Sequence, residues 1–298
     1  MSTPEELIAG AEKVSKKPSG LFSFLGSSHQ SRLEEAADLY VQAANLYKLQ
    51  KKNAQAGQTF EKAAKAQRDA ESPEEASNTL VEAYKAYKVE VPIEAARCLE
   101  EAIDMFVRRG QFRRSANFKA DLGELYENEL GEIQKAIDSY ETASEWYKGD
   151  NASSLANKFS IKAADLYCDD SVQNYTKAAT IYEAVAKDSL NNNLAKWSLK
   201  DYFLKAILCR LADNNDYASG NALLQRFLQW DPSFKTTREY EFAAKLVDSV
   251  RDGNPDGIAQ ASMEFDKFSR LDGFKIRVLN KIKSTVNEAP ADLEEDFT

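Results

Sequence analysis

The sequence predicts an all-α protein: a twisted array of antiparallel helical hairpins, capped by a C-terminal helical bundle. Three observations support this fold class. The 298 residues include only 12 glycines and 7 prolines, too few for a β protein with a turn every ten residues or so. Apolar residues recur in steps of three and four, which is the spacing of one helix face. Alanines also recur at a fixed interval, which indicates a structural repeat.

The repeat is marked by one small residue in each helix. The stretch "EEAADLYVQAANLYKL" shows the pattern, with alanines interleaved with leucine and tyrosine. Alanines 20 residues apart occupy the equivalent position: Ala36, Ala56, Ala76, Ala96, Ala116, Ala136 and Ala156, and Ala178 follows after 22. One helix with its turn therefore takes 20 residues and a hairpin takes 40, more than the roughly 34 of a tetratricopeptide (TPR) repeat. We expect a TPR-like solenoid in which each hairpin buries its apolar face against its neighbours. A coiled coil is excluded, because a heptad does not divide 20.

The regular spacing is lost after Asn191, which divides the chain. The breakers "DPSF" at Asp231 and "DGNPDG" at Asp252 follow. We predict a hairpin solenoid over residues 1–225, including an apolar loop at about 18–28. A C-terminal helical bundle over 226–283 and a flexible acidic tail over 284–298 complete the prediction.

Composition and motifs exclude several classes of protein. The net charge of −9 disfavours nucleic acid as a partner. The acidic N-terminal sequence is no secretory signal and no apolar run reaches the ~18 residues of a membrane span, so we expect a cytoplasmic protein. Cys98, Cys168 and Cys209 are widely spaced, as expected of buried thiols in a reducing compartment. No phosphate loop, nucleophile motif or metal motif occurs, so we expect no enzyme activity and no cofactor.

Three features remain for a binding function, each with a plainer alternative. Leu21, Phe22, Phe24 and Leu25 lie in the Gly- and Ser-rich stretch "KPSGLFSFLGSS". They either fold back over the first helices or insert into a bilayer or a partner groove. Basic residues either form a band across successive repeats or are scattered solvated charges: Arg108, Arg109, Arg113, Arg114, Lys119, Lys158, Lys162, Lys200 and Lys205. The end of the chain is either a solubilising segment or a docking segment: Glu288, Asp292, Glu294, Glu295, Asp296 and Phe297.

Several long stretches, in order along the chain, resemble the soluble NSF attachment proteins, in particular the alpha type of fungi. They are "SGLFSFLG", "LEEAADLYVQAANLYK", "GQFRRSANFKADLGELYENEL", "ANKFSIKAADL", "WSLKDYFLKAILC", "EFDKFSRLDGFKIRVLNKIK" and "EEDF". The resemblance implies a cytoplasmic adaptor, peripherally associated with membranes, that packs around the four-helix SNARE bundle. The adaptor recruits and stimulates the AAA+ ATPase NSF, which disassembles the bundle. The resemblance also implies several copies per bundle, and a monomer when free.

The resemblance assigns roles to particular positions. Membrane contact falls on Leu21, Phe22, Phe24 and Leu25. SNARE binding falls on the matching basic positions: Arg113, Arg114, Lys119, Lys158 and Lys200. ATPase binding falls on the acidic C-terminal positions: Asp248, Asp252, Glu294, Glu295, Asp296 and Phe297. Two positions depart from the family, since animal members have a basic residue where Asn117 stands, and the penultimate residue is usually Leu rather than Phe297.

Two other functions are compatible with the residues alone. A generic helical-repeat scaffold for another complex would share the fold. A peripheral membrane-binding protein unrelated to SNAREs would use the apolar loop, and it would bind liposomes with no dependence on SNAREs.

Overall fold

A computed structural model describes residues 2–16, 29–190 and 196–288 of the chain. The described residues form α-helices joined by short turns and contain no β-strand, which confirms the all-α prediction. Two compact units are present: an N-terminal unit, residues 1–156, and a C-terminal unit, residues 157–298. The predicted apolar loop and the last ten residues lie outside the described residues.

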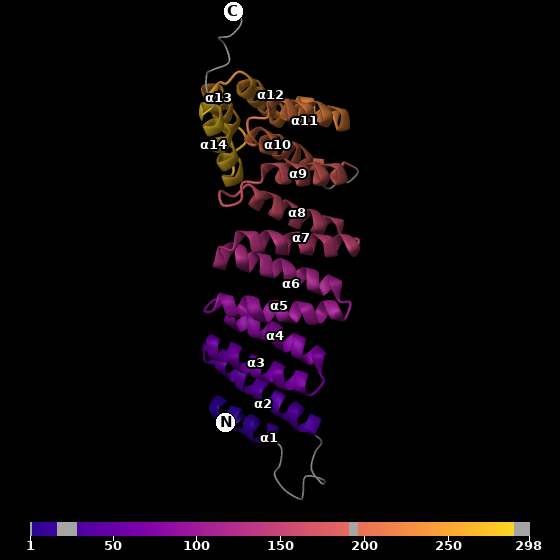
Figure 1. Cartoon of the computed structure of the whole chain (residues 1–298), viewed down its shortest axis with the longest axis vertical. Coiled ribbons are helices and arrows are strands. Elements are labelled where there is room, and N and C mark those ends of the chain that lie inside the picture. The colour runs from indigo at the N-terminus through magenta and orange to yellow at the C-terminus, as the bar shows by residue number, and fades with distance from the viewer. Residues whose placement is uncertain (1, 17–28, 191–195, 289–298) are drawn as a thin grey trace, which may run out of the picture. The chain divides into compact units, whose positions relative to one another are not determined.

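The helices of the N-terminal unit pack in chain order, each against the helix before it and the helix after it (Figure 1). This is the packing expected of a hairpin array. Its helices are α1 (Pro4–Ser15), α2 (His29–Leu49), α3 (Asn53–Asp69), α4 (Pro73–Tyr87), α5 (Pro92–Arg108), α6 (Phe112–Leu125) and α7 (Ile133–Gly149). A π-helical turn, η1 (Tyr126–Leu130), follows α6.

The alanines that define the 20-residue spacing all lie in the core. None of the eight, from Ala36 to Ala178, is more than 4% exposed. Two glycines allow even closer approach: a Cβ on Gly57 would lie 2.6 Å from the ring of Tyr87, and one on Gly123 would lie 2.6 Å from Tyr140. Small residues facing large rings therefore set the helix-to-helix packing, as the repeat predicts.

The turns between helices repeat with the same period. The amide of Lys52 donates to the carbonyl of Tyr47 (2.9 Å), and the amide of Ser72 donates to that of Gln67 (2.8 Å). Equivalent bonds join Gln111 to Phe106 (3.0 Å) and Ala152 to Tyr147 (2.9 Å). The residue before each donor has a positive φ: Lys51, Glu71, Gly110 and Asn151. These are Schellman motifs, which satisfy the last carbonyls of a helix and reverse the chain.

The helices of the C-terminal unit depart from simple chain-order packing. Helix α10 contacts α9, α11, α12 and α14, and Phe203 on α10 stacks on Phe227 with ring centroids 4.2 Å apart. The elements are α8 (Ser153–Tyr167, which begins just before the unit), α9 (Tyr175–Ser189), α10 (Lys196–Ala212), α11 (Tyr217–Trp230), a 3₁₀ turn η2 (Pro232–Thr236), α12 (Arg238–Arg251), α13 (Pro255–Asp266) and α14 (Gly273–Glu288).

Two predicted boundaries fall inside helices. The division between residues 225 and 226 lies within α11, because Leu224 and Phe227 are both buried on one continuous face. The predicted start of the tail at residue 284 lies within α14, which continues to Glu288 with Val286 only 6% exposed. Val286 lies one turn beyond Ile282, so the buried face of α14 continues past residue 284.

The three cysteines are free and buried, as the sequence predicts. Burial raises the pKa of the Cys98 thiol to about 12, so this group is an inert core residue rather than a nucleophile.

Candidate functional site

Two of the predicted SNARE-binding arginines are held by neighbouring helices. Arg113 Nη1 lies 2.7 Å from Asp150 Oδ2, and its guanidinium lies 5.3 Å from the ring centroid of Tyr147. Arg114 Nη2 donates to Asn78 Oδ1 at 2.6 Å, and its guanidinium lies 4.0 Å from the ring centroid of Phe106. Each arginine is therefore ordered, and the remaining N–H groups of its planar guanidinium are available to a partner's carboxylate.

An open groove of about 700 Å³ lies beside these arginines, between the start of α6 and the end of α7. Phe112 is 47% exposed and packs against Trp146, with ring centroids 6.4 Å apart. Asn117 also lines the groove, and its Oδ1 accepts a hydrogen bond from the Tyr147 hydroxyl at 2.6 Å. The groove combines exposed aromatic surface with arginine, the residue types enriched at protein interfaces.

Lys119 does not join the two arginines. At about 100° per residue, Lys119 lies about 120° around the α6 axis from Arg113 and about 140° from Arg114. The side chain is partly exposed and forms no ion pair within the described part of the chain. If Lys119 binds the same partner, it does so from another side of this helix.

The other two predicted SNARE-binding residues belong to the C-terminal unit. Lys158 on α8 is exposed, and its Nζ lies 5.1 Å from the ring centroid of Phe159, with no ion pair to any described residue. Lys200 on α10 differs, because its Nζ lies 2.9 Å from Oε1 of Glu239. Glu239 is only 8% exposed, and its Oε2 has no hydrogen-bond partner among the described residues. Lys200 therefore also compensates a buried carboxylate.

Trp197 was missed by the sequence reasoning. Its side chain is 86% exposed, in the first turn of α10 and three residues before Lys200, so both lie on one side of the helix. The available signal was a tryptophan between Lys196 and Ser198, outside the buried stripe. An exposed tryptophan is a strong candidate for an interface anchor.

The predicted acidic positions at the end of α12 share one cation. Arg251 Nη1 lies 2.9 Å from Asp248 Oδ1, and its Nε lies 2.9 Å from Asp252 Oδ1. The hydrogen bond from Arg251 lowers the pKa of Asp252 and raises the pKa of the guanidinium. The lowered pKa keeps the Asp252 carboxylate ionised near neutral pH, where it pairs with Arg251.

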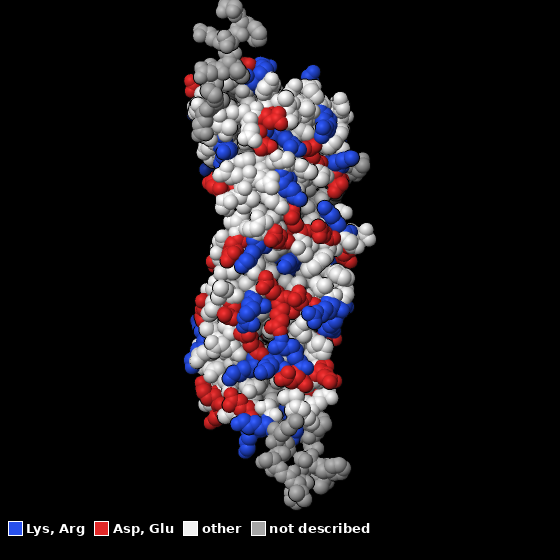
Figure 2. Space-filling model, viewed as in Figure 1, with Lys and Arg blue, Asp and Glu red and all other residues white. Residues whose placement is uncertain are grey.

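The remaining predicted site residues lie outside the described residues: Leu21, Phe22, Phe24, Leu25, Glu294, Glu295, Asp296 and Phe297. On the face shown in Figure 2, acidic and basic side chains are interspersed rather than separated into regions of one sign. Within the described ranges, no group of His, Cys, Asp and Glu residues could hold a metal ion, and no helix is long and apolar enough to cross a bilayer.

Comparison with known proteins assigns the family. The profile of the family described as "Soluble NSF attachment protein, SNAP" matches residues 2–287. The chain is 58% identical to vesicular-fusion protein SEC17 of Komagataella phaffii, over all of both chains. It is 46% identical to the alpha-soluble NSF attachment protein of Saccharomyces cerevisiae, over 98% of this chain and all of that protein. It is 35% identical to the human alpha-soluble NSF attachment protein, over 96% of each chain. The chain therefore belongs to the soluble NSF attachment protein family.

Proposed function

We propose that this chain is the adaptor between assembled SNARE bundles and the AAA+ ATPase NSF. It binds the bundle, recruits NSF and stimulates its ATP hydrolysis, and NSF then disassembles the bundle so that the SNAREs can serve another round of vesicle fusion. The adaptor itself is not an enzyme, and the energy comes from the ATPase. The family match over residues 2–287 is the observation that carries this proposal.

SNARE binding is assigned to Arg113 and Arg114, and on another side of α6 to Lys119, in the N-terminal unit. In the C-terminal unit it is assigned to Lys158 and Lys200, with Trp197 as an added apolar anchor; these residues together are called the SNARE-binding surface. Charges of this kind steer association with an acidic helical bundle over about 8–10 Å at physiological salt. The ordered guanidinium groups and the exposed aromatic residues Phe112 and Trp197 support this assignment. The charges steer association, and a buried aromatic side chain contributes binding energy.

The ATPase-binding surface consists of Asp248 and Asp252 at the end of α12 together with Glu294, Glu295, Asp296 and Phe297. The carboxylates steer a basic partner, and Phe297 fills an apolar pocket on it. The Phe297→Ala variant is expected to reduce stimulation of NSF with little change in SNARE binding. Phe297→Leu is expected to keep most of that stimulation, and full stimulation by Phe297→Ala would remove the tail from this surface.

Membrane contact is assigned to Leu21, Phe22, Phe24 and Leu25. The protein is cytoplasmic, is a monomer when free, and binds in several copies to each SNARE bundle. A short apolar loop is a weak anchor that needs a second contact. Replacing Leu21 and Phe22 with serine is expected to slow disassembly of membrane-anchored bundles and to spare soluble ones. An equal loss with both would assign the loop to the fold or to the SNARE contact.

A charge reversal at two lysines tests the SNARE-binding surface. Lys119 and Lys158 are suitable because neither forms an ion pair with a described residue, so reversal breaks no ion pair described in the fold. The Lys119→Glu, Lys158→Glu double variant is expected to bind an immobilised SNARE bundle at least tenfold more weakly and to retain correspondingly less NSF. Lys187→Glu, an exposed lysine of α9, is the control for the change in net charge. If the double variant binds the SNARE bundle as tightly as the parent does, the assignment of SNARE binding to this surface is wrong.

A further inference from the structure

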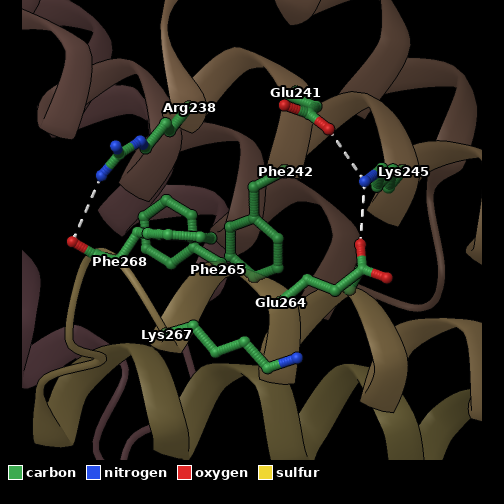
Figure 3. Close-up of a pocket in the computed structure, with 9 residues that line it drawn as sticks. Arg238, Glu241, Phe242, Lys245, Glu264, Phe265, Lys267 and Phe268 are labelled. Atoms are coloured by element: carbon green, nitrogen blue, oxygen red, sulfur yellow. Dashed lines mark hydrogen bonds and ion pairs between the residues drawn. The ribbon is translucent and has the colours of Figure 1, made fainter.

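A second groove lies between α12 and α13 in the C-terminal unit, and the proposed function does not use it. Its volume is about 460 Å³, within the roughly 300–1,000 Å³ of ordinary ligand pockets. Phe242 and Phe265 stack inside it with ring centroids 4.5 Å apart. Phe268 stands beside them (Figure 3) and is 70% exposed. An exposed phenylalanine next to two stacked rings is an apolar surface that a partner side chain can cover.

Cations surround the three rings. Arg238 lies with its guanidinium 4.8 Å from the ring centroid of Phe268 and donates to the Phe268 carbonyl at 3.4 Å. Lys245 lies between the two carboxylates of the groove, 2.9 Å from Glu241 and 2.9 Å from Glu264. Figure 3 shows this ion-pair cluster and Arg238 at opposite ends of the rings.

The charges of the groove do not balance. Both carboxylates are already paired with Lys245, whereas Arg238 and Lys267 form no ion pair within the described residues. Lys267 acts on Glu264 only as a minor cause of its lowered pKa. Three cations thus face two carboxylates, with the two unpaired cations flanking exposed aromatic surface. A segment that carries carboxylates next to an aromatic or aliphatic side chain complements this groove.

Such a segment follows α14 in the same chain. Residues 289–298 read "APADLEEDFT", with four carboxylates, an aromatic residue and no cation. Helix α14 packs against α13, and its 16 residues measure about 24 Å. The nine residues from Glu288 to Phe297 span up to about 30 Å when extended, so even the distant end of α14 is within reach of Phe297.

We propose that residues 292–297 bind in this groove of their own chain. Phe297 packs against Phe265 and Phe268, and the carboxylates lie toward Arg238 and Lys267. A short flexible linker gives an effective concentration in the millimolar range, so an intrinsic affinity of that order is enough to occupy the groove about half of the time. A contact this weak would sequester Phe297 in the free adaptor and yield to a tighter partner.

A spin label at the end of the chain tests this proposal on the isolated full-length protein, so no SNARE or NSF is involved. The three native cysteines are buried, so the nitroxide reagent is directed to the cysteine introduced by Thr298→Cys. The measured quantity is the loss of amide signal intensity with the oxidised nitroxide relative to the reduced, diamagnetic one. This loss is expected to be at least twofold larger for Glu264 and Phe268 than for Lys187 on α9. Uniform losses would overturn the proposal, whatever the outcome of the SNARE experiment above.

Variants separate the contacts that hold the tail. Phe297→Ala, and the pair Arg238→Glu with Lys267→Glu, are each expected to remove the selective loss at Glu264 and Phe268. Both cations are exposed and form no ion pair with a described residue, so helicity should not change. Lys187→Glu is the matched control and should keep the loss. Persistence of the loss in either groove variant would overturn the proposal. A mixture of spin-labelled chains without isotope enrichment and isotope-enriched chains without a spin label tests for contact between copies. Selective loss of signal in this mixture would place the tail in the groove of a second copy, and this would also overturn the proposal.

Discussion

Lys200 lies on the proposed SNARE-binding surface and also compensates Glu239. A reversal of this lysine therefore changes two properties at once, partner binding and stability, which is why it is absent from the charge-reversal test above. Lys158 has the same charge and no such partner. The comparison between these two lysines separates a residue with a structural role from one without.

The Lys200→Glu variant is expected to lower the free energy of unfolding by about 2–4 kcal/mol, because it leaves the buried Glu239 carboxylate unpaired and next to a like charge. Lys158→Glu is expected to change it by no more than about 0.5 kcal/mol. Urea denaturation at pH 7 measures both. Equal stability of the two variants would show that Glu239 does not need Lys200.

Lys275 forms a comparable buried contact in the C-terminal unit. Only 7% exposed, its Nζ lies 2.8 Å from Asp201 Oδ1 and 2.7 Å from Asp272 Oδ2. Burial acts to raise the pKa of Asp272, but the hydrogen bonds from the side chain and amide of Lys275 outweigh it and lower the pKa below the usual range of an aspartate. A carboxyl group with a lowered pKa stabilises the fold above its unfolded pKa, and that stability is lost as the pH falls through the folded value.

Acidification is therefore expected to weaken the contribution of Asp272. The parent should have a higher Tm than Asp272→Asn at pH 5, and the difference should shrink as the pH falls from 5 to about 2.5. Asp256→Asn, which replaces an exposed aspartate at the start of α13, is the control. A difference in Tm that stays constant over this range would contradict the lowered pKa of Asp272.

At the scale of helices and turns, the sequence predicted what local periodicity determines. The spacing of the alanines from Ala36 onward identified the repeating helices and their buried faces. The boundary predicted at residue 225 lies within α11 and the tail start predicted at 284 lies within α14, and the buried faces of these helices continue past both positions. The pairing of Lys200 with Glu239 joins residues 39 positions apart on different helices, so no local pattern could indicate it.

The turns permit a matched test with two glycines. Gly110 has φ of +71° and no atom within 4 Å of a Cβ built on it, so Gly110→Ala is expected to cost about 1 kcal/mol through backbone strain alone. Gly149 ends α7 without a positive φ and has the same open surroundings. Gly149→Ala is expected to stabilise by up to about 1 kcal/mol. Thermal unfolding of both variants measures this, and a change of the same sign in both would contradict the role given to φ at Gly110.

For the whole molecule, the net charge of −9 does not describe the individual surfaces. Arg113 and Arg114 flank an aromatic groove in the N-terminal unit, and Asp248 and Asp252 end a helix of the C-terminal unit. An adaptor requires distinct surfaces for partners of opposite charge, because one surface cannot steer both. The assignment of these surfaces to the SNARE bundle and to NSF belongs to the proposed function, and the periodicity of the sequence alone could not suggest it.

The central claim is that this chain couples NSF to the SNARE bundle, and a disassembly assay tests it most directly. A purified bundle that carries a fluorophore and a quencher on different SNAREs is mixed with NSF and ATP, with and without the chain. We predict that fluorescence rises only when the chain, NSF and ATP are all present, and that the Lys119→Glu, Lys158→Glu variant slows the rise. Disassembly by NSF at the same rate without the chain, or no disassembly with it, would contradict the claim.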